Sequence, residues 1–95
     1  MPANYIFVAD IRIHDKETNC IGVQEYKYFS KKFGGEHEVM FGKIGRQYIP
    51  LYPSSGIPSN TIVLSENVAS ELGVEEANNR SVFITDPDFI DYMAH

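Results

Sequence analysis

The alternation of apolar and polar positions near the start of the chain predicts a β-strand over residues 5–14. The odd-numbered positions of this segment are apolar throughout, whereas the even-numbered ones begin with Ile6 and Val8 and continue with Asp10 and Arg12. Successive side chains of a strand point to opposite faces, so the odd-numbered set is expected to face the core. The even-numbered set predicts a strand that starts inside the protein and ends at an exposed edge.

The next segment, residues 20–29, fits two structures. A helix running on to Phe33 is one, because Tyr26, Phe29 and Phe33 recur at helical spacing. A strand is the other, and it is favoured by the β-branched and aromatic content and by the glycine inside the segment. The polar residues 15–19 have the length of a hairpin turn, so we expect this strand to form a β-hairpin with the preceding one.

A second hairpin is predicted from residues 38–44 and 47–52, joined around Gly45-Arg46. Pro50 has no N–H to donate, so the second of these strands should lie at an edge of the sheet or carry a bulge. Residues 53–60 contain two prolines and a glycine, and we expect them to form the main irregular loop.

The clearest start and stop signals follow. Residues 62–64 are a short apolar run that predicts a buried strand. Ser65 is a suitable N-cap for a helix, and Gly73 lies where a left-handed C′ residue belongs. Val74 can fold back in a Schellman-type stop, so we expect one internal helix between Ser65 and Gly73.

A last strand and a short terminal helix complete the pattern. Residues 75–80 form a polar connection, and residues 81–85 predict a strand with Phe83 on the face opposite its two neighbours. Asp86 is a suitable cap and Pro87 a suitable first residue for a helix. The apolar stripe of that helix consists of Phe89, Ile90 and Met93.

These elements predict an α+β fold. It has a small, mostly antiparallel sheet or partly open barrel of five to six strands, one internal helix and one short C-terminal helix. Ninety-five residues suffice for one hydrophobic core, so residues 1–95 are expected to form a single domain.

The second half of the chain carries a short pattern of residues known from small barrels. It consists of the apolar run 62–64, a helix that ends in Leu72-Gly73-Val74, and the strand at residues 81–84. This pattern resembles a repeat unit of double-psi barrels and of swapped-hairpin barrels of the AbrB type. The pattern covers roughly a quarter of the chain, and residues 75–80 lack the Gly-Asp turn of those proteins. The resemblance implies a barrel-like fold, and no functional residue is transferred through it.

Composition indicates a cytoplasmic protein. Cys20 is the only cysteine, so no internal disulfide can form, which is typical of a reducing compartment. The first residues lack the basic and apolar regions of a signal peptide. No apolar run approaches the ~20 residues that span a bilayer, so we expect no membrane partner.

Charge is distributed unevenly along the chain. The net charge is −5, of which residues 1–47 contribute +1 and residues 48–95 contribute −6. Such asymmetry between halves predicts a charged interaction face. A solvated acidic surface that only aids solubility explains the same numbers equally well.

No motif for catalysis or cofactor binding stands out. Glu36-His37-Glu38 offers adjacent side chains that rarely all reach one ion, so no metal site is expected. Cys20 is better explained as a small packing residue than as a nucleophile. Gly42-Lys43-Ile44-Gly45 lacks the spacing of a phosphate loop, and Ser54-Ser55-Gly56 is an ordinary turn. We therefore expect no enzymatic activity and no cofactor.

Charged and aromatic side chains define two candidate surfaces. The acidic one, expected to bind a partner, consists of Glu66, Glu71, Glu75, Glu76, Asp86, Asp88 and Asp91. The other interleaves aromatic and basic residues, as nucleic-acid-binding strands do. It consists of Tyr26, Lys27, Tyr28, Lys31, Lys32, Lys43 and Arg46.

The leading hypothesis is a non-enzymatic protein-interaction module, for example an inhibitor or accessory factor. Its acidic C-terminal half would dock on a basic protein surface, including that of a protein that handles nucleic acid. The alternative is a small nucleic-acid-binding barrel that uses strands within residues 26–48. A third hypothesis is a head-to-tail homo-oligomer in which the basic half of one copy meets the acidic half of the next.

Overall fold

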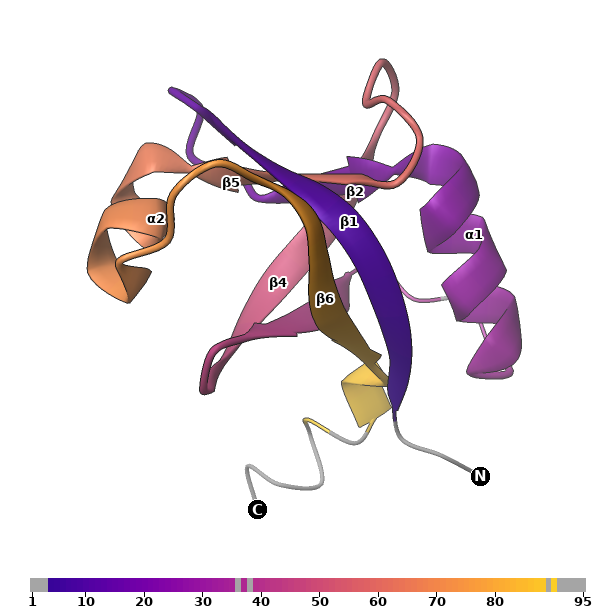
Figure 1. The fold of residues 1–95 in the computed structure, drawn as a ribbon. Helices are drawn as coiled ribbons and strands as arrows, with labels where there is room; N and C mark the ends of the chain where they lie inside the picture. Colours follow the sequence, from indigo (N-terminus) through magenta and orange to yellow (C-terminus); the bar gives the residue numbers. More distant parts are fainter. Residues whose placement is uncertain (1–3, 36, 38, 89, 91–95) are drawn as a thin grey trace.

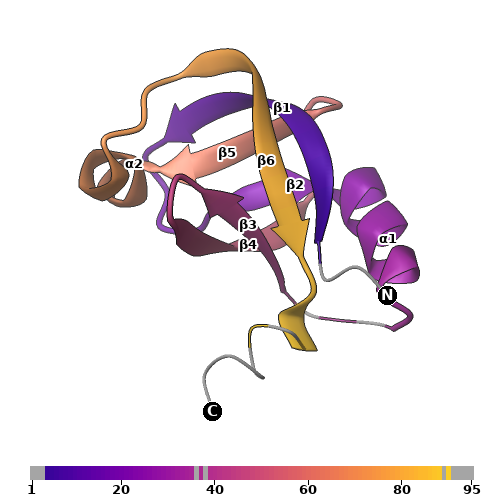
Figure 2. The same cartoon turned by 60° about the horizontal axis from the view of Figure 1, so that its bottom comes forward.

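A computed structural model describes residues 4–35, 37, 39–88 and 90 of the chain. Six strands close into a barrel in the order β1-β5-β2-β4-β3-β6, and two helices lie on opposite sides of it (Figures 1 and 2). The strands are β1 (Asn4–His14), β2 (Cys20–Gly22), β3 (Met40–Ile44), β4 (Gln47–Ser54), β5 (Thr61–Ser65) and β6 (Ala77–Thr85). The helices are α1 (Val23–Lys32) and α2 (Glu66–Leu72).

The barrel mixes antiparallel and parallel pairs. Four of its six pairings are antiparallel, but β1 pairs with β5 and β2 with β4 in parallel. The α+β class and a small barrel-like fold are thus confirmed, but the barrel is closed rather than partly open, and a mostly antiparallel sheet is only partly matched. The hairpin predicted between residues 5–14 and 20–29 is wrong, because β2 pairs with β4 and β5 instead of β1.

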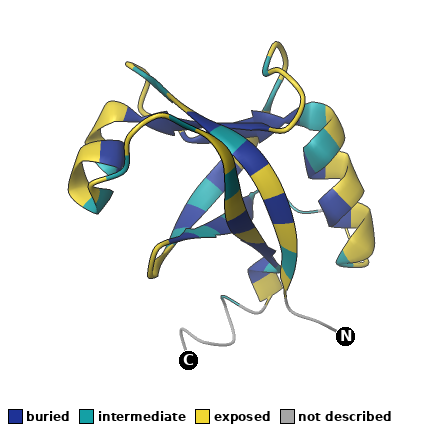
Figure 3. Cartoon of the chain, viewed as in Figure 1, coloured by how far each residue is buried: buried dark blue, intermediate teal, exposed yellow. Residues whose placement is uncertain are grey.

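Strand β1 follows the predicted alternation on one face only. Phe7, Ala9 and Ile11 are buried in the core, as expected for the odd-numbered set. The prediction that the even-numbered face starts inside is wrong, because Ile6 and Val8 are exposed on the outside of the barrel. This alternation of buried and exposed residues is visible along β1 in Figure 3.

The prediction of a strand over residues 20–29 is correct only for β2. From Val23 onward the chain is helical, as the alternative based on helical spacing indicated. Phe29 and Tyr26 are buried on the inner face of α1, and the Phe29 ring meets the Phe7 ring edge-on at 5.5 Å. Burial of this apolar stripe against the barrel outweighs the weak β-propensity of the individual residues.

Helix α2 begins and ends as predicted. The Ser65 hydroxyl accepts a hydrogen bond from the Val68 N–H at 3.2 Å. Gly73 has φ 66°, a left-handed conformation that favours glycine. The Gly73 N–H donates to the Ser70 carbonyl and the Val74 N–H to the Ala69 carbonyl, which is the Schellman pattern.

The hairpin of β3 and β4 is confirmed, but the structure differs from the prediction in two details. The loop predicted over residues 53–60 is shorter, because β4 continues to Ser54 and pairs there with β2. The Tyr52 N–H donates to the Asn19 carbonyl on the β2 side. Strand β4 lies between β2 and β3, so the prediction of an edge strand is wrong for β4 as a whole. Amides two residues apart in a strand point the same way, so the N–H that Pro50 lacks would face the β2 side at a level where β2 has not yet begun. No bulge interrupts the pairing of β3 with β4.

Strand β6 is longer than predicted. It begins at Ala77 rather than at residue 81, and its register against β1 shifts between Ala9 and Ile11. Asn79 has φ 55° within this shift, as bulges often require. Of the predicted C-terminal helix, Pro87, Asp88 and Ile90 are helical. The remaining residues of that prediction, Phe89 and Met93 among them, lie outside the described residues.

Neither helix within the described residues has the length and apolar character required to cross a bilayer.

Candidate binding groove

Strand β1 is much longer than the strand that closes the barrel beside it. It has 11 residues, whereas β5 has 5 and pairs only with the half of β1 from Asp10 to His14. The other half of β1, residues 4–9, pairs with β6 along one edge. Along its opposite edge, no strand from the described part of the chain covers it.

The direction of the backbone groups in β1 follows from two hydrogen bonds. The Asp10 N–H donates to the Asn60 carbonyl on the β5 side, at 2.8 Å. The Ile13 N–H donates to the Glu76 carboxylate on the β6 side, at 3.0 Å. Backbone groups alternate in direction along a strand, so even-numbered residues face the β5 side. The backbone N–H and C=O groups of Ile6 and Val8 therefore lie along the uncovered edge and point away from β6.

Helix α1 forms the other wall beside this edge, and aromatic rings hold it there. The Phe29 ring lies 5.5 Å from the Phe7 ring and 6.4 Å from the Tyr5 ring. Between helix and strand lies a groove of about 940 Å³. Its lining consists of Tyr5, Ile6, Phe7, Val8, Asp10, Gln24, Glu25, Tyr28, Phe29, Lys32, Ser59, Asn60 and Asn79.

Three exposed apolar side chains gather at the groove. Ile6 is 64% exposed, Val8 is 49% exposed and Tyr28 on α1 is 57% exposed. Scattered apolar residues are normal on protein surfaces, but these three line one hollow. The same hollow also has polar lining residues, among them Gln24 and Asn60, so its chemistry is mixed. Exposed apolar side chains that gather in one hollow are typical of an interaction site.

The two ends of the groove differ in charge. The Lys32 ammonium lies 5.2 Å from the centre of the Tyr5 ring and 5.0 Å from that of Tyr28, so the rings hold it at one end. Among the described residues, Lys32 forms no ion pair. Helix α1 runs opposite to β1 (Figure 1), so Asp10 and Glu25 line the groove toward its other end. Asp10 is already engaged there, since its Oδ1 accepts from the Asn79 N–H.

The predicted acidic surface is divided between two ends of β6. Glu66, Glu71 and Glu75 are exposed on α2 and just after it, beside the barrel. Asp86 and Asp88 follow the far end of β6, whose 9 residues span about 26 Å at ~3.3 Å per residue. Figure 1 shows the two ends well apart. Glu76 is engaged with the Ile13 N–H, and Asp91 lies outside the described residues.

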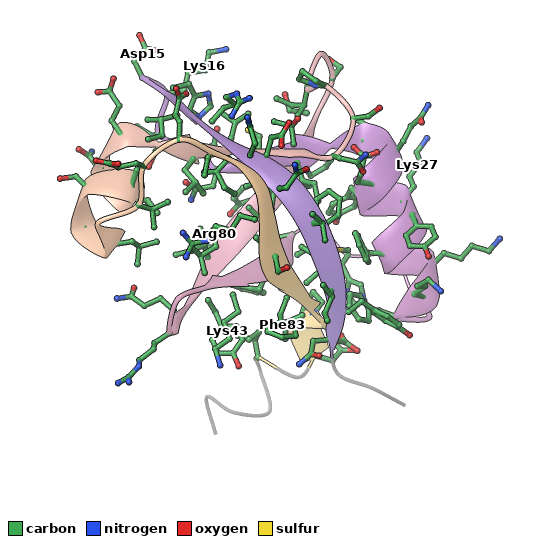
Figure 4. The ribbon with its side chains drawn as sticks, viewed as in Figure 1. Asp15, Lys16, Lys27, Lys43, Arg80 and Phe83 are labelled. Atoms are coloured by element: carbon green, nitrogen blue, oxygen red, sulfur yellow. The ribbon has the colours of Figure 1, made fainter. Side chains whose placement is uncertain are left out.

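The predicted aromatic and basic surface is also divided. Lys27, Tyr28, Lys31 and Lys32 are exposed on α1, but Tyr26 of the same helix is buried. Lys43 and Arg46 belong to the β3–β4 hairpin. Figure 4 shows Lys27 and Lys43 on different sides of the molecule. No single surface therefore presents the whole set.

One group of side chains has the donor types of a metal site. His37, Asp86 and Asp88 each place a ligand atom within 4.8 Å of the others. Asp86 also caps its own turn, since its Oδ1 accepts from the Asp88 N–H at 2.9 Å. Exposed acidic groups often gather without binding an ion, so this cluster alone does not indicate a metal site. Sequence spacing did not indicate it, because His37 and Asp86 are distant in the chain.

Comparison with family models, with curated proteins and with solved structures found no significant match. The groove is therefore characterised by its own geometry. The sequence offered one signal for it, since Ile6 and Val8 share a strand face with the polar Asp10 and Arg12. From the sequence alone this pattern predicts burial of the first half of the strand, and the exposure of Ile6 and Val8 shows that this is wrong.

Proposed function

We propose that this protein is a non-enzymatic protein-interaction module that binds a partner in the groove between β1 and α1. The observation that supports it best is the hollow of about 940 Å³ beside the exposed side chains of Ile6, Val8 and Tyr28. Burial of apolar surface is the main favourable term in protein association. Tyrosine is enriched among the residues that dominate binding energy, and Tyr28 would be such an anchor.

The acidic residues beside α2 have a part in the same proposal. Glu66, Glu71 and Glu75 are exposed and α2 has no basic residue in its last turn, so a basic partner would be attracted to this side. Replacement of Glu71 and Glu75 by lysine should slow association and weaken its salt dependence. An unchanged association rate would remove this acidic surface from the proposal.

The groove itself is tested by photo-crosslinking in the native lysate. A photoreactive phenylalanine analogue at Tyr28 should yield a discrete adduct whose partner is then identified by mass spectrometry. The matched control carries the same analogue at Tyr52, which is exposed on β4 outside the lining of the groove. Reconstitution with the purified partner must then give the same adduct. Equal adducts from both positions, or none, would contradict the proposal.

Nucleic-acid binding is the second candidate function, and the exposed basic residues of α1 favour it. Lys27, Lys31 and Lys32 lie on this helix with Tyr28, and lysine and aromatic side chains together can bind a single strand. A gel shift with single-stranded and duplex oligonucleotides at low salt tests this function. A shift that is lost on replacement of Lys27 and Lys31 by glutamate would favour it over the leading proposal.

Self-assembly is a third candidate, and the placement of the helices favours it. The basic α1 and the acidic α2 lie on opposite sides of the barrel (Figure 1), so copies stacked head to tail would bring opposite charges together. Sedimentation velocity at increasing protein concentration tests it. A constant sedimentation coefficient would reject it.

A further inference from the structure

We propose that the groove binds an extended segment of a partner protein by β-strand addition to the uncovered edge of β1. This inference rests on the proposed function and specifies how the partner binds. The segment would lie in line with β5, beside residues 4–9 of β1, with α1 on its other side. The occupant is thus a polypeptide that lacks structure of its own over this stretch.

The hydrogen-bonding groups of the edge select a polypeptide. Ile6 and Val8 each direct an N–H and a C=O into the groove, and no hydrogen bond from the described part of the chain satisfies them. Paired backbone groups are the rule in proteins, and an open strand edge is a template for another strand. An extended segment presents donors and acceptors at the same spacing, so it matches both residues at once.

The position of β5 shows where the added strand would run. The Asp10 N–H bonds to the Asn60 carbonyl, the last described hydrogen bond on this edge before the groove begins. Residues 4–9 extend about 17 Å at ~3.3 Å per residue. The groove runs beside the same residues from Tyr5 to Asp10. The added strand would therefore extend the line of β5, which pairs with β1 in parallel.

Side-chain chemistry limits the sequence of the occupant. Alternate side chains of the segment would lie beside Tyr5 and Phe7 on one face and beside Ile6 and Val8 on the other. Both faces favour β-branched residues. A carboxylate at one end would reach Lys32, which has no ion-pair partner among the described residues. We therefore expect an acidic residue at that end and a basic residue at the opposite end, near Glu25.

Two short peptides serve as probes. The one that binds more tightly shows whether the added strand runs parallel or antiparallel to β1. Both are fluorescein-labelled heptapeptides of alternating valine and threonine. One begins with aspartate and ends with lysine, which suits a strand parallel to β1; the other has the two charges exchanged. Fluorescence anisotropy should show that the chain binds one of them at least about tenfold more tightly than the other, because only one places its carboxylate beside Lys32.

Backbone methylation of the better peptide tests the edge directly. Methyl groups on alternate amides remove the donors that face one side only. One alternate set should weaken binding by about tenfold or more, because it removes the hydrogen bonds to β1, and the other set should weaken it far less. This period of two is the signature of an added strand. Equal effects of both sets, or binding of neither heptapeptide, would overturn the inference.

Val8→Pro tests the edge from the protein's side. Proline removes an N–H that β6 does not use, so the barrel keeps its hydrogen bonds. The matched control, Val8→Thr, keeps the N–H and the shape of the side chain. Binding of the better peptide should fall about tenfold in Val8→Pro and stay within about twofold in Val8→Thr. Circular dichroism checks that both variants fold. If Val8→Pro does not fold, the methylated peptides alone test strand addition.

The inference and the proposed function can fail separately. A partner that crosslinks at Tyr28 and binds Val8→Pro as well as Val8→Thr would preserve the function and overturn strand addition. A chain that dimerises in solution, and that Val8→Pro makes monomeric, would show that a second copy occupies the edge. That result would overturn the assignment of a separate partner.

Discussion

Ile6 on β1 lies directly opposite Phe83 on β6, and both side chains point outward from the barrel. Ile6 is 64% exposed and Phe83 is 42% exposed. The next strand places Lys43 opposite Phe83, and Figure 4 shows these two residues close together. The Lys43 ammonium in turn lies 5.5 Å from the Tyr48 ring centre. An apolar pair on the outer wall is thus continued by a cation and an aromatic ring.

Because this pair is exposed, its loss should affect stability little. Cross-strand pairs contribute roughly 0.2–1 kcal/mol, so Phe83→Thr should lower the free energy of unfolding by less than about 1 kcal/mol. Val82→Thr is the matched control, since Val82 directly precedes Phe83 on β6 and is buried. The control places a hydroxyl in the core and should cost about 1–3 kcal/mol. Urea denaturation measures both, and equal losses would contradict the outward orientation of Phe83.

Asn19 connects three segments of the barrel and should be sensitive to substitution. Its buried side chain accepts a hydrogen bond from the Ser65 N–H at 2.9 Å, and its carbonyl accepts one from the Tyr52 N–H. Asn19→Ala leaves the Ser65 N–H without its partner and should cost about 1–3 kcal/mol. Asn67→Ala, on the exposed side of α2, should change the free energy of unfolding by less than about 0.5 kcal/mol. Comparable values for both would argue against this role of Asn19.

Gly42 is required by close packing inside the barrel. A Cβ at this position would lie 2.9 Å from Leu51 Cδ1 and 3.2 Å from Val82 Cγ1. Gly42→Ala should therefore destabilise the protein by about 1–3 kcal/mol, as overpacked cores do. In the double variant with Leu51→Ala the clash is relieved. The double variant should therefore lose less stability than the sum of the losses in the two single variants. Strict additivity in thermal unfolding would show that Leu51 does not limit the space at Gly42.

Gly73 is required by backbone conformation instead. Its φ of 66° places a Cβ in a strained position, although no atom lies within 4 Å of the site where that Cβ would be. Gly73→Ala should cost about 1–2 kcal/mol for this reason. Gly73→Asn tolerates the left-handed region better and should lose less. The order Gly, Asn, Ala in melting temperature checks the assignment, and an Ala variant as stable as the Asn variant would contradict it.

Local signals in the sequence were sufficient for part of the fold. Ser65 and Gly73 define the ends of α2 through groups within one turn of each, so no distant contact is needed to predict them. The β3–β4 hairpin follows from its own short turn. Helix α1 follows from the sequence only as the less favoured alternative, because the burial of Phe29 against Phe7 is decided by a contact between distant segments. The same limitation concealed the parallel pairing of β1 with β5.

The candidate site depends almost entirely on such distant contacts. The groove exists because β5 pairs only with Asp10 to His14 and leaves the first half of β1 uncovered on that edge. The pattern within residues 4–14 does not indicate how long the neighbouring strand is. The acidic residues are close together in the sequence, but the length of β6 separates Glu75 from Asp86 in space. Charge composition could therefore predict an acidic half and could not predict one acidic surface.

The pairing of β1 also determines when the barrel can close as the chain is made. Its partners are β5, which begins at Thr61, and β6, which ends at Thr85. Among the described strands β1 is made first, and it must wait for β5 and then for β6 before it is paired on both edges. Non-local pairing of this kind slows folding to roughly milliseconds to seconds, which stopped-flow refolding would measure. Until β6 is complete β1 has at least one open edge, and this interval is when nascent chains are most prone to aggregate through it.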